Sequence, residues 1–158
     1  MDTHALQHHH PETAHLTRWL VVGFICGTVS VLLFHQGAVA LLHALGVTPR
    51  TAFPMQATQP FGIPQVWSLA FWGGVWGILL AAAFVRLDGA RLLAASLVFG
   101  AVLPTLVAWF VVAPLKDQPI AAGWAATGMA VGLIANGAWG LGTGLGLMLF
   151  GRRTGNGP

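Results

Sequence analysis

The placement of the charged side chains constrains this chain more than any other feature. Aspartate, glutamate, lysine and arginine are absent from four long stretches, which are residues 19–49, 51–85, 92–115 and 118–151. Each stretch contains an apolar segment long enough to cross a hydrocarbon core of about 30 Å, which takes about 20 helical residues. The sequence therefore predicts an integral membrane protein that passes through the lipid bilayer four times.

The composition supports the same fold class. Of the 158 residues, 56% are hydrophobic and 7% are charged, whereas about a quarter of the residues in a soluble domain are charged. We therefore expect an all-α, four-helix membrane bundle, with 1–18 as a disordered, histidine-rich cytoplasmic tail and 151–158 as a short second tail. The predicted spans are Trp19–Leu45, Val66–Val85, Leu92–Ala113 and Gly123–Phe150.

The basic residues at the span ends predict the orientation. Five arginines fall on one side of the predicted membrane, namely Arg18, Arg86, Arg91, Arg152 and Arg153, and two cations fall on the other, namely Arg50 and Lys116. Because cytoplasmic loops carry the excess of lysine and arginine, both termini are expected in the cytoplasm of a bacterium, with the spans in its inner (plasma) membrane. The cations are scattered singly rather than clustered, so nucleic acid is not a predicted partner.

Small residues recur at helical spacing on three of the spans. The predicted helix-packing glycines are Gly23, Gly27, Gly73, Gly77, Gly128, Gly132, Gly140 and Gly144. Such GxxxG-like faces let two helix backbones approach closely in a membrane. Because this surface is larger than two helix pairs need, the first hypothesis is a noncatalytic protein that docks through glycine faces, as a homo-oligomer or as an accessory subunit of a membrane complex.

A weak internal repeat suggests two repeated helical hairpins. The segment 74–77 (GVWG) matches the segment 137–140 (GAWG), a Gln-Pro pair precedes each, and each helix ends in phenylalanine followed closely by arginine. Copies with two spans each would have the same orientation and would be related by an axis along the membrane normal. The spacing differs between the copies, so two unrelated hairpins are the alternative.

Four polar residues within the spans are candidates for a binding site: His35, Gln36, His43 and Asn136. In a regular helix Gln36 and His43 share a face, while His35 lies about 100° around from Gln36. The amide of Asn136 needs a partner in mid-membrane, and an interhelical hydrogen bond worth about 1 kcal/mol is its simplest role. The second hypothesis is a small transporter or channel with a polar site at His35, Gln36 and Asn136.

Two proline features bear on that site. The connection 46–65 contains four prolines among aromatic and aliphatic residues, which suits either an ordered flap over the histidines or a plain interfacial connector. Pro104 lies near the middle of the third span and cannot donate a backbone hydrogen bond, so a kink is expected there.

The spans contain no carboxylate, lysine or arginine, and the chain has no metalloprotease motif, nucleophile elbow or phosphate-binding loop. We therefore expect neither catalysis nor a cofactor. The histidine tract His8, His9 and His10 is a weak candidate for binding a divalent metal, against the simpler interpretation of a solvated tail.

Four segments resemble those of a family of small, uncharacterised bacterial inner-membrane proteins with four helices. They are 30–37 (SVLLFHQG), 60–77 (PFGIPQVWSLAFWGGVWG), 111–116 (VVAPLK) and 136–144 (NGAWGLGTG). The resemblance covers the four spans but not the histidine tail. It implies a bacterial origin and a four-helix bundle, and it transfers no activity to any residue.

Overall fold

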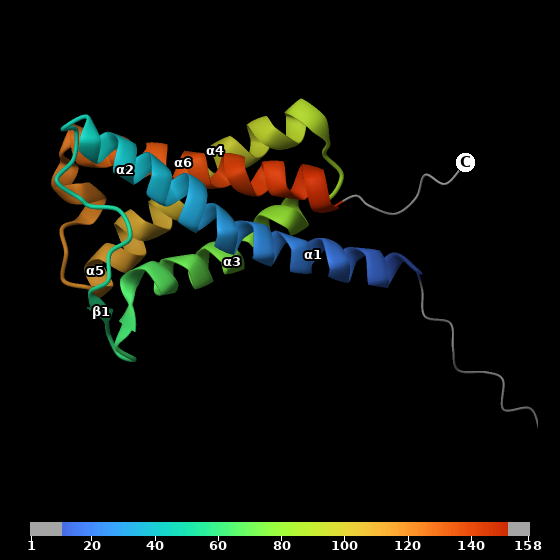
Figure 1. Ribbon diagram of the computed structural model, residues 1–158, viewed down its shortest axis with the longest axis horizontal. Coiled ribbons are helices and arrows are strands. Elements are labelled where there is room, and N and C mark those ends of the chain that lie inside the picture. The colour runs from blue at the N-terminus through green and yellow to red at the C-terminus, as the bar shows by residue number, and fades with distance from the viewer. Residues whose placement is uncertain (1–10, 152–158) are drawn as a thin grey trace, which may run out of the picture.

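The computed structural model describes residues 11–151, which form an all-α bundle of four long helices (Figure 1). The first is continuous through α1 (Pro11–Ser30), η1 (Val31–His35) and α2 (Gln36–Ala44), and the second is α3 (Gln65–Ala83). The third runs through α4 (Gly89–Val107), η2 (Ala108–Val112) and α5 (Ala113–Leu115), and the fourth through α6 (Ala126–Gly146) and η4 (Leu147–Gly151). The predicted four-helix fold is confirmed.

All four helices are long and apolar enough to cross a membrane, over 14–44, 65–83, 89–115 and 126–151. This is the architecture of a multi-pass membrane protein. The first span was predicted to begin at Trp19, but residues 11–18, which we assigned to the tail, are helical. A proline at the first helical position lacks only an N–H that would be unpaired there anyway, so Pro11 is compatible with this early start.

The fourth span begins at Ala126 rather than at the predicted Gly123. Before it lies η3 (Ile120–Trp124), in which Ala121, Ala122, Gly123 and Trp124 have φ angles of 48°, 55°, 67° and 59°. A right-handed helix cannot contain residues in this left-handed region, which costs non-glycine residues about 1–2 kcal/mol each. The left-handed turn therefore ends the connection and sets the start of α6.

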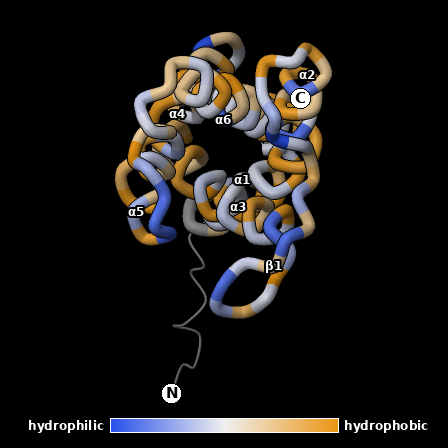
Figure 2. Tube along the Cα trace, turned by 90° about the vertical axis from the view of Figure 1, so that its left-hand side faces the viewer, coloured by the Kyte–Doolittle hydropathy of each residue, from blue (hydrophilic) through white to orange (hydrophobic). Residues whose placement is uncertain are grey.

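The bundle is built from two antiparallel helix pairs. The most extensive contacts are between α1 and α3 and between α4 and α6, while α1 and α6 join the two pairs. The backbones of α3 and α4 come close at few points. An end-on view shows α4 and α6 on one side and α1 and α3 on the other (Figure 2). This pairing agrees with two hairpins, although the matched tryptophans differ: Trp139 is buried against α1, whereas half-buried Trp76 packs edge-on against Phe99.

The two ends of the bundle are different. The terminus end is where α1 begins, η4 ends and the short connection 84–88 lies, and the loop end carries the connections 45–64 and 116–125 (Figure 1). In the first of these connections β1 (Ala57–Thr58) and β2 (Ile63–Pro64) form a two-residue antiparallel hairpin, with Thr58 opposite Ile63.

Glycines bring the backbones of each pair into contact. A Cβ added at Gly27 would collide with the carbonyl oxygen of Gly73, and one added at Gly77 would collide with that of Gly23. In the other pair, a Cβ at Gly140 would lie 2.9 Å from the Cα of Gly100. Lipid gives helices little hydrophobic reason to associate, so close packing of this kind is a main source of their attraction.

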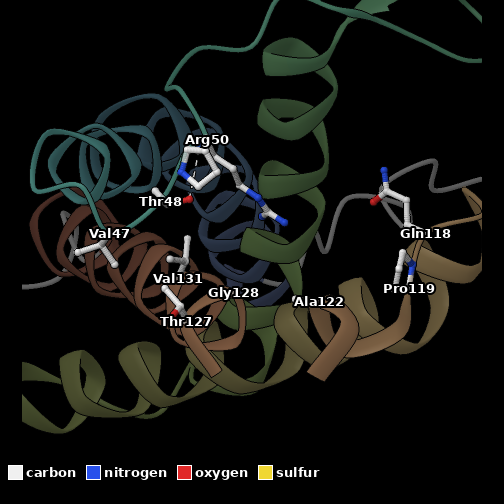
Figure 3. Close-up of a pocket in the computed structure, with 10 residues that line it drawn as sticks. Val47, Thr48, Arg50, Gln118, Pro119, Ala122, Thr127, Gly128 and Val131 are labelled. Carbon is white, nitrogen blue, oxygen red and sulfur yellow. Dashed lines mark hydrogen bonds between the residues drawn. The ribbon is translucent and has the colours of Figure 1, made fainter. Parts of the chain in front are cut away.

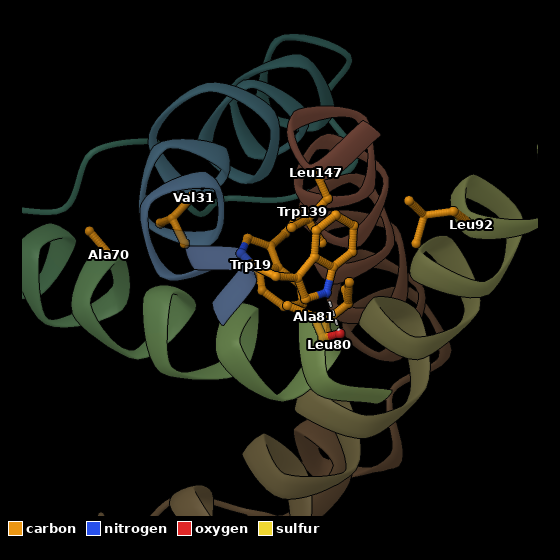
Figure 4. Packing of buried hydrophobic residues seen from close by; sticks show 8 residues of the cluster. All are labelled: Trp19, Val31, Ala70, Leu80, Ala81, Leu92, Trp139 and Leu147. Carbon is orange, nitrogen blue, oxygen red and sulfur yellow. Dashed lines mark hydrogen bonds between the residues drawn. The ribbon is translucent and has the colours of Figure 1, made fainter. Parts of the chain in front are cut away.

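Two buried tryptophans, Trp19 at the terminus end and Trp139 in the middle of the fourth long helix, form hydrogen bonds between helices (Figure 4). The indole N–H of Trp19 donates to the carbonyl oxygen of Ala81 at 2.7 Å, which links α1 to the last turn of α3. The indole N–H of Trp139 donates to the carbonyl oxygen of Gly27 at 2.9 Å, and Ser30 Oγ donates to the carbonyl oxygen of Trp139 at 2.7 Å. The last two bonds cross between the helix pairs, so this part of the bundle is a single tightly packed unit.

Two glycines on α6 give a matched test of the packing. Gly140→Leu should cost about 3 kcal/mol or more of unfolding free energy, because the side chain would occupy the place of the α4 backbone. Gly132→Leu should be neutral or stabilising by up to about 1 kcal/mol, because its Cβ would meet nothing nearer than Trp109 Nε1 at 3.5 Å and leucine favours the helix. Reversible unfolding in mixed micelles measures both; equal losses would contradict the packing described.

Two buried serines give a second matched pair. Ser30 Oγ is hydrogen bonded across the bundle, whereas Ser96 Oγ has no partner among the described residues. Ser30→Ala should lower the unfolding free energy by roughly 1 kcal/mol, the usual worth of such a bond in a membrane protein. Ser96→Ala should lower the unfolding free energy by much less, or raise it. The same unfolding assay measures both variants, and equal losses would contradict the hydrogen bonding described.

Candidate functional site

A cavity of about 330 Å³ lies between the four helices towards the loop end. Three of the four polar residues singled out in the spans line it, namely His35, Gln36 and Asn136. They come from the first and last long helices, about a hundred positions apart in the sequence. The other polar residues of the lining are Arg50, Thr51, Gln65, Thr105, Trp109, Lys116 and Gln118.

A second cavity, of about 390 Å³, lies beside the first (Figure 3). The two share six lining residues: Arg50, Gln118, Pro119, Ala122, Gly128 and Val131. Thr48, Pro49 and Thr127 belong to the second cavity and not to the first. The shared walls make the two spaces neighbours, so we call them the inner and the outer cavity.

Gln36 holds the proline-rich connection over the inner cavity. Its side chain is 1% exposed, and its Oε1 accepts a hydrogen bond from the backbone N–H of Phe53 at 2.7 Å. Phe53 has a φ of 54°, in the left-handed region that non-glycine residues seldom adopt. Pro54, the next residue, lines the inner cavity. The connection is thus ordered and lies against the site, as the flap interpretation expects.

His43 is not part of the cavity lining. Its Nδ1 lies 3.0 Å from the carbonyl oxygen of Thr48, and Thr48 Oγ1 accepts from the backbone N–H of Arg50 at 3.2 Å. We grouped His43 with Gln36 because a regular helix puts both on one face. Both residues do lie in the regular helix α2, but His43 is two turns beyond Gln36, about 10 Å further along the helix axis, and it does not reach the cavity lining. His43 instead positions the start of the connection that carries Arg50.

Asn136 joins the third and fourth helices beside the cavity. Its Nδ2 donates to Thr105 Oγ1 at 2.9 Å, and Thr105 Oγ1 lies 3.5 Å from the carbonyl oxygen of Gly132, one turn earlier on α6. The expected interhelical partner is therefore present. Because its side chain also lines the cavity and is only half-buried, Asn136 can serve both packing and recognition.

Breaks in regular helix surround the cavity. Pro104 has no N–H to donate within α4, and the π-helical turn η2 comes after it and contributes Trp109 to the lining. On the opposite wall η1 ends at His35, and the left-handed turn before α6 contributes Ala122. Such π-helical turns are frequently found at functional sites, because they reorient side chains at a small cost in hydrogen bonding.

Arg50 and Lys116 make the lining positively charged. Neither forms an ion pair within residues 11–151, and no aspartate or glutamate of this part of the chain lines either cavity. From the sequence alone these two cations indicate only the orientation. Because both belong to connections at the same end of the bundle, their sequence positions could also have predicted that they lie near one another and near the polar residues of the spans.

The predicted packing glycines fall into two groups. Gly23, Gly27, Gly73, Gly77, Gly140 and Gly144 lie against other helices of the same chain. Gly128 and Gly132 instead line the inner cavity. A Cβ at Gly132 would face Trp109 and Thr105 of the third long helix at 3.5 Å or more, whereas one at Gly128 would lie 3.0 Å from the Cβ of Ala122 in η3. One face of α6 thus packs along its second half and borders a cavity along its first half.

The candidate metal ligands His8, His9 and His10 lie outside the described residues. Within 14–151, no group of three or more histidine, cysteine or carboxylate side chains is placed to hold a metal ion. Comparison with protein-family profiles, with curated proteins and with solved structures gives no match. The case for a function therefore depends on the site itself.

Two further substitutions on α6 test whether water reaches the inner cavity. In a Cys26→Ala background, Gly132→Cys should react with a small, membrane-impermeant thiol reagent, because position 132 lines the cavity. Gly137→Cys should not react, because position 137 is buried against Leu97 and Ala101 of α4. Mass spectrometry of protein in sealed vesicles measures the labelling. An unreactive Gly132→Cys in folded protein would contradict an accessible cavity.

Proposed function

We propose that this chain is a noncatalytic, multi-pass membrane protein that binds a small polar solute in the inner cavity. The observation that carries the proposal is the convergence of His35, Gln36 and Asn136 on one space from two distant helices. Polar side chains within membrane spans are costly, and they commonly mark ligand or ion pathways. Volumes of about 300–1,000 Å³ are typical of small-molecule sites, and the inner cavity lies at the lower end of that range.

The docking hypothesis has less support. It was motivated by an excess of glycine surface. Of the eight predicted packing glycines, however, six already pack against helices of the same chain and two line the inner cavity. No second copy is needed to cover them. A polar cavity capped by a loop that is hydrogen bonded to a buried glutamine is not explained by docking.

We place the cavity on the outer side of a bacterial inner membrane. This assignment rests on the five arginines expected on the cytoplasmic side, which put the loop end outside. Arg18, Arg86 and Arg91 all belong to the terminus end, whereas Arg50 and Lys116 belong to the loop end. The solute would then enter from the periplasm or the external medium.

Transport is a second candidate, and the irregular helices favour it. Transporters commonly bind substrate near the middle of the membrane beside interrupted helices. Here the breaks at η1, Pro104 and η2 lie around the cavity, while the terminus end is closed by tightly packed side chains such as Trp19, Leu80 and Leu147. The structure would correspond to a state open towards the loops, and release on the other side would require the terminus end to separate.

Thermal unfolding of the purified protein tests solute binding. A panel of small neutral, zwitterionic, anionic and cationic solutes should include at least one that raises the unfolding temperature of the wild type. A ligand at about a hundred times its dissociation constant contributes about 2.7 kcal/mol. Gly132→Leu, which fills the cavity without disturbing the helix packing, should remove that shift. Failure of every class to stabilise the wild type, or equal stabilisation of both proteins, would overturn the proposal.

A further inference from the structure

We infer that the bound solute carries an anionic oxygen group, a carboxylate or a phosphate, which is held by Arg50 with Lys116 while the neutral part enters the inner cavity. This inference rests on the proposed solute-binding function and specifies its ligand class. It depends on the charge of the lining, on the position of Arg50 and on the polar groups beyond it.

The charge balance of the lining selects against cations. Two positive side chains border the inner cavity, and within residues 11–151 no carboxylate borders it. Asp117, the carboxylate that neighbours Lys116 in the chain, lines neither cavity. Both cations are exposed at the loop end of the cavity, so they attract an anion and repel a cation, with an effect that salt weakens.

Arg50 is placed where a solute would pass. It lines both cavities, and its side chain extends from the connection towards the space bordered by Gln118, Ala122 and Gly128 (Figure 3). Its backbone N–H is already bonded to Thr48 Oγ1, which fixes the start of the side chain. The guanidinium group presents five N–H donors in a planar arrangement that matches a carboxylate or a phosphate.

Beyond Arg50 the inner cavity is neutral and polar. His35, Gln36, Asn136 and Trp109 supply hydrogen-bonding groups, and Val39, Val131 and Ala135 supply apolar wall. The Oε1 of Gln36 is engaged by Phe53, and the Nδ2 of Asn136 is engaged by Thr105. The side-chain oxygen of Asn136 has no hydrogen bond among the described residues, so it can accept one from a hydroxyl or amide of the solute.

The anionic group has two sources, a dissolved organic acid or phosphate and the headgroup of a phospholipid. Both present oxygens of the same chemistry to Arg50. They differ in the part of the molecule attached to the anionic group. A dissolved acid carries a small polar body there, whereas a phospholipid carries acyl chains that stay in the bilayer.

Isothermal titration of the protein in phosphatidylcholine nanodiscs tests the inference. The probes are lactate, succinate and inorganic phosphate, with the neutral compounds lactamide and succinamide as counterparts. An anion should bind at least tenfold more tightly than its neutral counterpart, and added salt should weaken its binding. Arg50→Gln should lower that affinity about ten- to a hundredfold, as expected for the loss of a charged hydrogen bond. Lys116→Gln should lower it less.

Arg86→Gln is the matched control, because Arg86 is an exposed arginine at the terminus end. It should leave the affinity unchanged. If lactamide and succinamide bind as well as the acids and Arg50→Gln has no effect, the anion inference fails while solute binding stands. If no probe binds, no solute of the thermal panel stabilises the protein and no lipid is retained through Arg50, both proposals fail.

Native mass spectrometry distinguishes the two sources. Nanodiscs that contain phosphatidylglycerol should yield protein free of retained lipid if the ligand is a dissolved anion. One retained phosphatidylglycerol that is lost in Arg50→Gln but kept in Arg86→Gln would support the inference with a headgroup as the source. Lipid retained equally by all variants, together with no binding of the acids, would overturn it.

Discussion

Direct contact between glycine backbones is the constraint on which the rest of this bundle depends. In lipid the hydrophobic effect gives little preference for one helix over the surrounding acyl chains, so the helices must approach closely to attract one another. Gly23, Gly27, Gly73 and Gly77 achieve this between α1 and α3, and Gly100 and Gly140 achieve it between α4 and α6. The hydrogen bonds of Trp139 and Ser30 then join the two helix pairs and fix their position along the bundle axis.

Close packing at one end leaves the other end free to separate around a cavity. Towards the termini, large side chains such as Trp19, Leu80 and Leu147 are almost fully buried. Towards the loops, π-helical turns and a left-handed turn replace regular helix, and Gly132 faces the cavity instead of the backbone of another helix. The tightest packing and the cavity are therefore found in different halves of the same four helices.

Sequence reasoning predicts the four helices well because burial in lipid demands long, uncharged, apolar segments, and these are visible without a structure. It also identifies His35, Gln36 and Asn136, since polar groups stand out in such spans. It also groups His43 with Gln36, because the two share a face of α2, but a shared face does not show how far along the helix a cavity extends. Spacing cannot tell whether a glycine meets a backbone, as Gly140 does, or a cavity, as Gly132 does, because that depends on the path of the neighbouring helix.

The cations that line the cavity belong to the connections, whereas the neutral polar groups belong to the spans. Insertion of a helix into lipid is sensitive to each charge it carries, whereas neutralising a cation at the end with fewer cations keeps the charge asymmetry that orients the spans. Neutralising positions 50 and 116 would therefore change the charge of the cavity lining without placing a charge in a span. Variation in the charge of this lining would then be concentrated in the two connections.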